Sequence, residues 1–296
     1  TNTAISYNGY SIYKNELTSE QLSKIKADLT VIPKICPGYG SLDPEPFVLY
    51  KENTNKIYVP RYYGYKKIGE AKLNKLHHGI TITNTRFDGI LRPYQVTILD
   101  VWSENARKYG GGIISVGPGR GKTVIAIAKI SELKLKTLVL VHTSDLLNQW
   151  IERFNQYMPD ANIGIIQSKK ISVVNKDIVI GMIQSLSSPK KDKEYPPELF
   201  KEFGLIVIDE CHHMGAKVFC RCLRKTAFKY TMGLSATPDR TDGLTKVFKY
   251  YLGDICYKDS SIQKTVEELQ LDHIPDADIR IYNYYCQNNT YSKEIL

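Results

Sequence analysis

Short apolar runs alternate with helical patterns along the chain from Gly111 onward. A strand that is buried on both faces is a nearly continuous apolar run, whereas an amphipathic helix repeats its apolar residues every three or four positions. The runs GIISV, TLVLVH, DIVIGMI, GLIVIDE and KYTMGLSA predict strands. Between them, TVIAIAKISELK and SDLLNQWIERFNQY predict helices, the second one capped by Ser144. This alternation predicts an α/β fold with a parallel sheet and helices on both faces.

A different pattern occupies the first eighty or so residues, which we expect to form a small α+β domain. Residues 18–29 place apolar side chains on one helical face, and Thr18 and Gln21 have the spacing of a capping box. The segment FVLYKENTNKIYVP, residues 47–60, predicts a hairpin of two strands around a polar turn.

Aromatic and basic residues are mixed in the segment that follows this hairpin, RYYGYKKIGEAKLNK. Aromatic rings stack on bases and lysines pair with phosphates, so this strip is a candidate for nucleic-acid contact. The alternative, which we favour slightly, is the edge of a hairpin whose lysines are solvated.

The composition is that of an ordinary globular protein with a basic surplus: 42% of residues are apolar, 24% are charged, and the formal net charge is +9. This charge suits a polyanionic partner, most commonly nucleic acid, although a basic protein without such a partner is the alternative. No window approaches the ~20 apolar residues of a membrane span. The N-terminal residues lack the layout of a signal peptide, and the six cysteines form no CxxC pair. We therefore expect reduced thiols in an intracellular protein, cytoplasmic, nuclear or viral.

A glycine-rich loop joins the first of these strands to its helix, in SVGPGRGKTVIAIA. Small residues allow backbone N–H groups to surround phosphates, and the helix N-terminus adds partial positive charge. Lys122 would reach the β- and γ-phosphates of ATP, and Thr123 would bind Mg²⁺. The strict pattern has glycine at the position of Val116, but the strand–loop–helix context still predicts a phosphate-binding loop. Its residues are Gly117, Pro118, Gly119, Arg120, Gly121, Lys122 and Thr123.

Two acids end the predicted strand LIVIDE. Asp209 fits the acid that holds Mg²⁺ at the tip of a strand near a phosphate loop, and Glu210 is placed to orient and deprotonate the attacking water. The residues after them raise the alternative of zinc, but their spacing is neither CxxC nor HxxxH. Cys220 and Cys222 are two residues apart on a predicted helix, so their side chains point in different directions. We therefore expect no zinc site among Cys211, His212, His213, Cys220 and Cys222.

With the phosphate loop and DECHH both present, the chain resembles the first motor domain of a superfamily 2 helicase with a DExH-type second motif. LRPYQ resembles the motif whose glutamine recognises the adenine edge, which implies Gln95, with Arg92 as a second candidate. LVLVHTSDLLNQW and IGMIQSL resemble motifs Ia and Ib, which touch the nucleic-acid backbone in the family. This resemblance implies nucleic-acid contacts at Thr143, Gln184 and Ser185.

GLSATPDRTDG resembles motif III, so Ser235 and Thr237 are implied to couple the ATP state to strand movement. His212 is implied to link the phosphate site to that motif. Together the motifs resemble those of XPB- and UvsW-like DNA helicases and the helicases of large DNA viruses. The RNA-directed DEAD-box pattern fits less well, because the second motif ends in His212 and not in aspartate. The resemblance implies a RecA-like fold, ATP and Mg²⁺ as cofactors, and DNA as partner, with RNA as the alternative.

We expect a small domain at residues 1–85, which could contact nucleic acid, a RecA-like helicase domain at 86–260, and a linker at 261–296. The family hydrolyses ATP between two motor domains, so a second RecA-like domain is expected in cis or in trans. This chain alone is therefore expected to be a poor ATPase. Two alternatives remain open: a nucleotide-binding module that recognises DNA without hydrolysing ATP by itself, and the motor subunit of a restriction-type complex.

Overall fold

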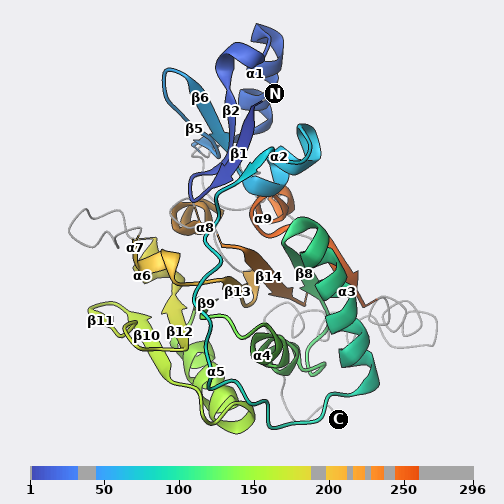
Figure 1. Ribbon diagram of the computed structural model, residues 1–296, viewed down its shortest axis with the longest axis vertical. Helices are drawn as coiled ribbons and strands as arrows, with labels where there is room; N and C mark the ends of the chain where they lie inside the picture. Colours follow the sequence, from blue (N-terminus) through green and yellow to red (C-terminus); the bar gives the residue numbers. More distant parts are fainter. Residues whose placement is uncertain are drawn as a thin grey trace, which may run out of the picture. The chain divides into compact units, whose positions relative to one another are not determined.

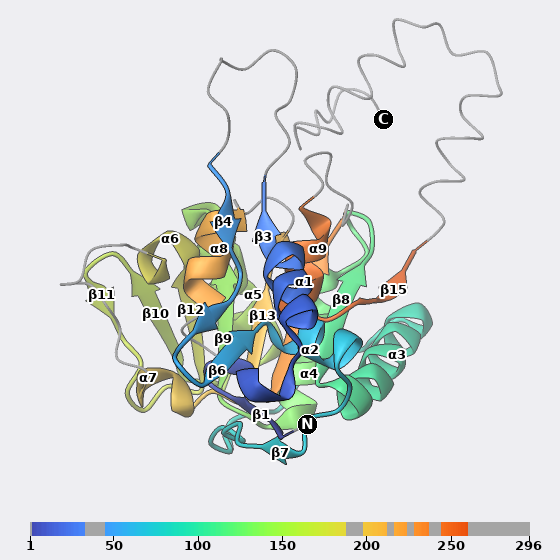
Figure 2. The same cartoon turned by 90° about the horizontal axis from the view of Figure 1, so that it is seen from above.

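The computed structural model describes residues 2–32, 45–187, 198–211, 216–223, 228–236 and 244–259. In these residues the largest element is an eight-stranded sheet in the order β11-β10-β12-β9-β13-β14-β8-β15 (Figures 1 and 2). Each neighbouring pair is parallel except β10 with β11. The strands are β8 (Gly111–Ser115), β9 (Thr137–Val141), β10 (Ile163–Gln167), β11 (Lys170–Ile171), β12 (Ile178–Met182), β13 (Leu205–Ile208), β14 (Tyr230–Ser235) and β15 (Ile255–Lys258).

Each face of this eight-stranded sheet, called the motor sheet below after the resemblance of its segments to a motor domain, carries its own apolar core. On β9, Leu138 and Leu140 belong to one core and Val139 and Val141 to the other, because side chains alternate across a strand. Helices α3, α4 and α5 cover one face, and α6, α8, α9 and the N-terminal unit cover the other (Figure 1). The predicted α/β sheet with helices on both faces is confirmed. These helices are α3 (Pro93–Tyr109), α4 (Lys122–Leu133), α5 (Ser144–Tyr157), α6 (Ile183–Leu186), α8 (Ala216–Leu223) and α9 (Thr245–Leu252), with α7 (Glu198–Lys201) beside them.

The five strands that the apolar runs predict are β8, β9, β12, β13 and β14. All of them lie in the middle of the sheet, where both faces are covered. The sequence prediction missed β10 and β15, which lie toward the two sides of the sheet. In β10, buried and partly exposed side chains alternate, and in β15 the side chains are partly or fully exposed. Within the described residues no helix is long and apolar enough to cross a bilayer.

The N-terminal unit has a second sheet, in the order β5-β6-β2-β1-β7, and a separate pair of strands, β3 and β4. The predicted helix is present as α1, and its capping box is confirmed: the side chains of Thr18 and Gln21 each accept the other residue's backbone N–H. The small α+β character of this unit is therefore confirmed. Its elements are β1 (Thr3–Ser6), β2 (Gly9–Tyr13), η1 (Lys14–Glu16), α1 (Ser19–Asp28), β3 (Thr30–Val31), β4 (Phe47–Val48), β5 (Lys51–Glu52), β6 (Lys56–Val59), α2 (Arg61–Lys67) and β7 (Leu73–Asn74).

The hairpin predicted over residues 47–60 is only partly correct. Its second half forms β5 and β6, which pair antiparallel around a turn. Its beginning, β4, pairs with β3 instead. Leu49 lies between the two pairings: its side chain is buried and its backbone N–H donates to the Leu29 carbonyl. Leu49 therefore marks the point at which the chain leaves one pairing for the other.

The aromatic and basic strip after the hairpin is also not a strand edge, because it begins with helix α2. Tyr62 and Tyr63 are buried. The Tyr62 hydroxyl lies 2.6 Å from the Thr231 hydroxyl of β14, and the Tyr63 hydroxyl donates to Asp28 at 3.1 Å. Arg61 donates to the carbonyls of residues 228 and 229. These tyrosines hold the N-terminal unit together and against the motor sheet, so they do not offer a stacking surface for bases.

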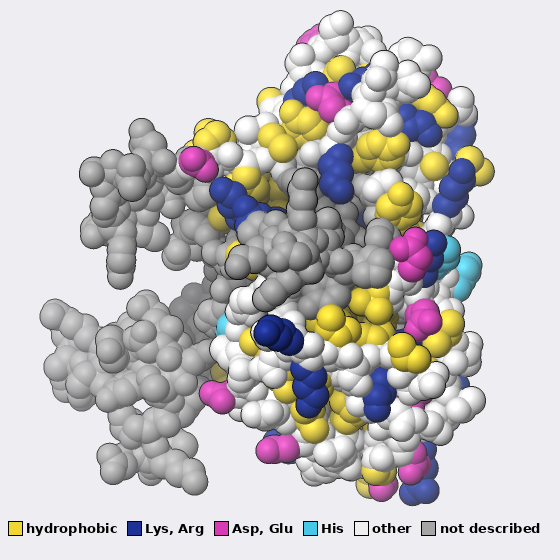
Figure 3. Space-filling view, turned by 90° about the vertical axis from the view of Figure 1, so that its left-hand side faces the viewer, with side chains coloured by type: hydrophobic (Ala, Val, Ile, Leu, Met, Phe, Trp, Pro, Cys, Tyr) yellow, Lys and Arg dark blue, Asp and Glu magenta, His cyan; other side chains and the backbone are white. Residues whose placement is uncertain are grey.

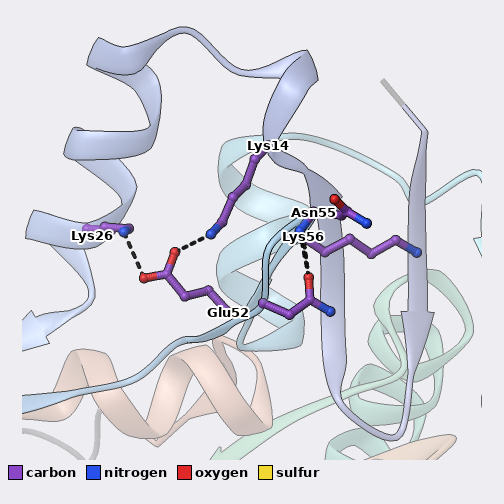
Figure 4. A network of polar contacts seen from close by, with 6 residues as sticks. Lys14, Lys26, Glu52, Asn55 and Lys56 are labelled. Atoms are coloured by element: carbon purple, nitrogen blue, oxygen red, sulfur yellow. Dashed lines mark hydrogen bonds and ion pairs between the residues drawn. The ribbon is translucent and has the colours of Figure 1, made fainter.

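Ion pairs tie together the outer elements of this unit, as Figure 4 shows. The Glu52 carboxylate on β5 lies 2.6 Å from the ammonium of Lys14 and 2.8 Å from that of Lys26. The hydrogen bonds from Lys14 and Lys26 lower the pKa of Glu52. All three side chains are partly exposed, so water screens the charges and the network stabilises the unit only modestly.

Candidate nucleotide and nucleic-acid site

The predicted phosphate loop connects β8 to α4 at the carboxyl edge of the motor sheet, where parallel sheets bind their ligands. Gly119 and Gly121 have φ angles of +73° and +77°, in the left-handed region that favours glycine. A Cβ at Gly121 would lie 2.5 Å from the Gln95 side-chain nitrogen, whereas a Cβ at Gly119 would meet open space. Val116, where the strict pattern has glycine, is buried in the apolar core between the sheet and helices α3, α4 and α5. This departure therefore leaves the loop itself intact.

A direct contact joins this loop to the acids after β13. The Lys122 ammonium, at the first residue of α4, donates to Glu210 Oε1 at 2.6 Å. Both side chains are largely buried, with 11% and 18% of their surfaces exposed. Lys122 and Glu210 are 88 positions apart in the sequence. The fold thus brings together the two motifs that the sequence assigned to phosphate binding and to water activation.

Asp209 is the most enclosed of the site carboxylates, with 5% of its surface exposed. Its Oδ2 accepts the indole N–H of Trp150 at 2.8 Å, and its Oδ1 accepts the backbone N–H of Glu210 at 3.0 Å. Burial raises the pKa of Asp209, and the Trp150 hydrogen bond opposes this shift. Glu210 has a φ of +45°, a strained conformation for a residue with a side chain, and such strain is often found at functional sites.

The donor set suits Mg²⁺, which prefers oxygen ligands from one or two carboxylates and from substrate phosphates. Asp209 supplies a carboxylate at the end of β13. Thr123 supplies a hydroxyl from the second residue of α4, in the turn that begins at Gly121. In the loop before α4, a Cβ added at Gly119 would meet no atom within 4 Å. The chemistry of these residues fits a Mg²⁺–nucleotide complex.

Gln95 and Arg92, the predicted adenine contacts, lie at the start of α3. Gln95 Oε1 accepts the Arg92 backbone N–H at 2.9 Å, and Gln95 Nε2 donates to the Arg120 carbonyl at 3.1 Å. Tyr94, which the sequence prediction missed, also donates to the Arg120 carbonyl, at 3.2 Å, and its ring lies 5.5 Å from the Arg120 guanidinium. These contacts hold the phosphate loop, while adenine recognition by Gln95 and Arg92 stays a prediction.

The predicted nucleic-acid contacts follow β9 and β12 at the same edge. Thr143 is the N-cap of α5, because its side chain accepts the backbone N–H of Leu146. The prediction that Ser144 caps this helix was therefore wrong by one residue. The Ser144 hydroxyl instead accepts a hydrogen bond from Gln167 at 3.1 Å. Thr143 and Ser144 are both exposed.

Gln184 and Ser185 lie on α6, directly after β12. The Gln184 amide donates to the His142 carbonyl at 2.7 Å, and the Ser185 hydroxyl accepts the Ser168 backbone N–H at 2.9 Å. The fold therefore gathers residues from three strand ends into one polar cluster, which we call the edge cluster. Its members are Thr143, Ser144, Gln167, Ser168, Gln184 and Ser185.

The sequence reasoning missed two members of the edge cluster, Gln167 and Ser168. It also missed the exposed Lys169, which follows them in the chain. They belong to a polar turn after the unrecognised strand β10. Ser168 has a φ of +53°, which turns the chain sharply at this point. The available signal was the short apolar run IGII at residues 163–166.

Ser235, predicted to couple ATP state to movement, ends β14 and is fully buried, and its carbonyl accepts the Val116 backbone N–H at 3.1 Å. This hydrogen bond joins the end of β14 to the residue directly before the phosphate loop. The other predicted coupling residues, His212 and Thr237, lie outside the described residues, as do His213 and residues 261–296.

The cysteines near the acids are buried. Cys220 and Cys222 lie on α8, so the predicted helix is confirmed, and Cys211 directly follows the acids. Burial raises the pKa of the Cys211 thiol to about 12. The expectation of no zinc site stays a prediction that metal analysis can test.

The basic surplus does not form one patch on the face that Figure 3 shows. Among the described residues of that face, lysine and arginine side chains lie dispersed between apolar and neutral ones, with acidic side chains nearby. On this face, the described basic side chains therefore mark no single surface for a polyanion. Contact with nucleic acid has to be argued from the strand ends.

Residues 88–240 match the family described as "Type III restriction enzyme, res subunit". The chain is 38% identical over 258 residues to a putative ATP-dependent RNA helicase of Acanthamoeba polyphaga mimivirus, covering 86% of this chain and 49% of that protein. It is 35% identical over 179 residues to the DNA 3'-5' translocase XPB2 of Sulfurisphaera tokodaii, covering 60% of this chain and 37% of that protein. The chain thus spans about half the length of the mimivirus relative, and less of the archaeal one.

A solved structure of the UvsW helicase from bacteriophage T4 has the same fold. Its TM-score is 0.59 at 16% sequence identity, and the alignment covers 88% of this chain and 100% of that one. A likeness at this level of identity supports the RecA-like arrangement of the motor sheet and carries no information on substrate.

Proposed function

Since the chain belongs to the family of type III restriction enzyme res subunits, we propose that it works as the first motor domain of an ATP-dependent DNA helicase or translocase. The observation that carries the proposal is the 2.6 Å contact between Lys122 and Glu210, which unites a phosphate loop with a strand-end acid pair. The names of its relatives, a helicase and a translocase, agree with this function.

Nucleotide binding would begin with an exchange of partners at Lys122. In the structure its ammonium is bound to Glu210. The β- and γ-phosphates of ATP carry more negative charge than one carboxylate, so the ammonium would transfer to them. The backbone N–H groups around Gly119 and Gly121, with the N-terminus of α4, would surround the same phosphates.

The same exchange would release Glu210 for catalysis. Thr123 and Asp209 would hold Mg²⁺, which when bound neutralises charge on the phosphates. Glu210, no longer paired with Lys122, would orient a water molecule for in-line attack and accept its proton. Lys122 thus both binds the phosphates and keeps Glu210 occupied until a nucleotide arrives.

Nucleic acid would lie along the edge cluster, beside the nucleotide site on the same sheet edge. Hydroxyl and amide groups such as those of Thr143, Gln184 and Ser185 commonly contact phosphate and sugar, which positions a strand without reading its sequence. We assign DNA, because the DECHH motif resembles that of DNA helicases and one relative is named a DNA translocase. RNA is the alternative outcome, since the mimivirus relative is named an RNA helicase.

Full activity would also require a second RecA-like domain, in cis or in trans. In this family the second domain supplies an arginine finger to the nucleotide. In other P-loop enzymes such an arginine raises the rate of hydrolysis by roughly 10³–10⁵-fold. We therefore expect residues 1–296 by themselves to bind ATP weakly, to hydrolyse it slowly and to separate no strands. The proposed activity would be intracellular, in the cytoplasm, in the nucleus or in a viral context.

Titration calorimetry and fluorescence anisotropy test this proposal. Residues 1–296 should bind a Mg²⁺–ATP analogue, and Lys122→Ala should not; Lys134→Ala, which removes an equal charge from the far end of α4, should bind normally. A labelled DNA duplex should bind more tightly than an RNA duplex of the same sequence, with an affinity that falls steeply with salt. Failure of the wild-type chain to bind nucleotide would refute the proposal, and tighter RNA binding would reassign the substrate.

A second candidate is the motor subunit of a restriction-type complex, which the description of the matching family favours. It predicts the same ATP chemistry and differs in its partner. Co-purification with a nuclease or methyltransferase subunit, together with ATP-dependent DNA cleavage by the complex, would decide for it.

A further inference from the structure

Trp150 occupies an unusual place for a core tryptophan. It lies in the middle of α5 with 1% of its surface exposed, and its ring packs 5.7 Å from that of Phe154. Its indole N–H donates to Asp209 Oδ2 at 2.8 Å. A hydrogen bond to a carboxylate in a low-dielectric interior is among the stronger ones in proteins.

This hydrogen bond helps to fix the orientation of the Asp209 carboxylate. The backbone of Asp209 is held by its N–H, which donates to the Leu140 carbonyl at 3.0 Å. Its carboxylate is held by the Glu210 backbone N–H on one oxygen and by Trp150 on the other. Mg²⁺ demands near-ideal octahedral geometry, so a carboxylate that rotates freely would bind the ion less well.

The helix that carries Trp150 begins in the edge cluster. Thr143 caps α5 and Ser144 bonds to Gln167, about two turns before Trp150. An α-helix of this length moves as a rigid element, so a shift at its first turn displaces the indole as well. One helix therefore touches both the surface proposed for nucleic acid and the carboxylate proposed for Mg²⁺.

We propose that Trp150 is a positioning residue that couples nucleic-acid binding at the start of α5 to Mg²⁺–nucleotide binding at Asp209. The proposal rests on the function proposed above and adds a route between its two ligands. Coupling is reciprocal: DNA that shifts α5 changes the affinity for Mg²⁺–nucleotide, and Mg²⁺–nucleotide changes the affinity for DNA by the same factor.

The matched variants are Trp150→Phe, which keeps an aromatic ring and removes the N–H, and Trp102→Phe, which alters the chain's other tryptophan, on α3. Loss of a partner that orients a metal ligand typically costs 10–100-fold in metal affinity. In Trp150→Phe we expect the affinity for ADP in EDTA to stay within about twofold of wild type. The increase in nucleotide affinity that Mg²⁺ provides should fall tenfold or more. DNA should no longer change the nucleotide affinity. Trp102→Phe should retain all three.

Fluorescence gives a readout independent of activity. In Trp102→Phe the only tryptophan is Trp150, and its emission should change when Mg²⁺–ADP is added and again when DNA is added. If Trp150→Phe fails to fold, this measurement decides by itself. Unchanged emission, or undiminished Mg²⁺ dependence and DNA coupling in a folded Trp150→Phe, overturns the proposal. A wild-type chain that binds no nucleotide refutes the proposed function instead.

Discussion

The two halves of the motor sheet's carboxyl edge differ in chemistry. After β8 and β13, Lys122, Asp209 and Glu210 are charged, largely or almost fully buried, and held within 3.0 Å of their partners. After β9, β10 and β12, the edge cluster consists of neutral hydroxyl and amide groups that are mostly exposed. Buried charges act strongly on one another because water does not screen them, whereas exposed neutral groups contribute little each.

This contrast fits the two tasks of the proposed function. A triphosphate is small and densely charged, so a few buried, preorganised groups can hold it and act on it. A nucleic-acid strand is long and must move, so many weak contacts that break easily serve better than a few strong ones. Changes at the nucleotide end should therefore abolish function, and changes at the edge cluster should only reduce it.

The largest effect on nucleotide binding is expected for Lys122→Ala. Truncating one member of a buried charge pair costs about 2–5 kcal/mol in binding, which corresponds to roughly 30-fold or more in affinity. Calorimetry with a Mg²⁺–ATP analogue should show little or no binding. Unchanged affinity would contradict the assignment of Lys122 to the phosphates.

Glu210→Gln should separate binding from chemistry. The neutral amide keeps a similar shape but accepts no proton, so ATP should bind within a few-fold of wild type. Hydrolysis by the motor assembled with its second domain should fall by about 10²–10⁴-fold. A steady-state phosphate-release assay measures this, and turnover at the wild-type rate would show that Glu210 is not the base.

Substitutions in and beside the edge cluster should have small and distinguishable effects. Gln184→Ala removes a neutral group worth about 0.5–1.5 kcal/mol, so DNA affinity should drop by a few-fold while its salt dependence stays the same. We expect Lys169 to contact a phosphate. Lys169→Ala should therefore make the negative slope of log affinity against log salt less steep by about one. Anisotropy titrations between low and moderate salt resolve the two. A total loss of binding in either variant would contradict the idea of distributed contacts.

The smallest effect is expected from metal removal. Purified protein should contain no stoichiometric zinc, and a chelator should leave the melting temperature unchanged in the absence of nucleotide. The reason is that Cys211 is a buried thiol and that Cys220 and Cys222 diverge on α8. One zinc per chain in an elemental analysis would overturn this expectation.

The success of the sequence reasoning depended on how local each feature is. The glycine loop was predictable because the φ angles at Gly119 and Gly121 exclude most other residues wherever the loop occurs. The helix α2 was not predictable, because Tyr62 and Tyr63 fit a strip for bases as well as a core until their partners on other elements are known. The partner of Gln95 was also out of reach, since the Arg120 carbonyl lies 25 positions away.

By itself, the sequence determined the five central strands of the large sheet, the phosphate loop and the acid pair at the end of β13, because periodicity and backbone chemistry act over a few residues. Only the tertiary structure decided that Lys122 meets Glu210 and that Trp150 reaches Asp209. It also decided that Gln167 bonds to Ser144 and Ser168 to Ser185. These contacts join residues up to 88 positions apart, and the order of strands in the sheet selects them. That order depends on pairings between strands far apart along the chain, which no short stretch of residues carries.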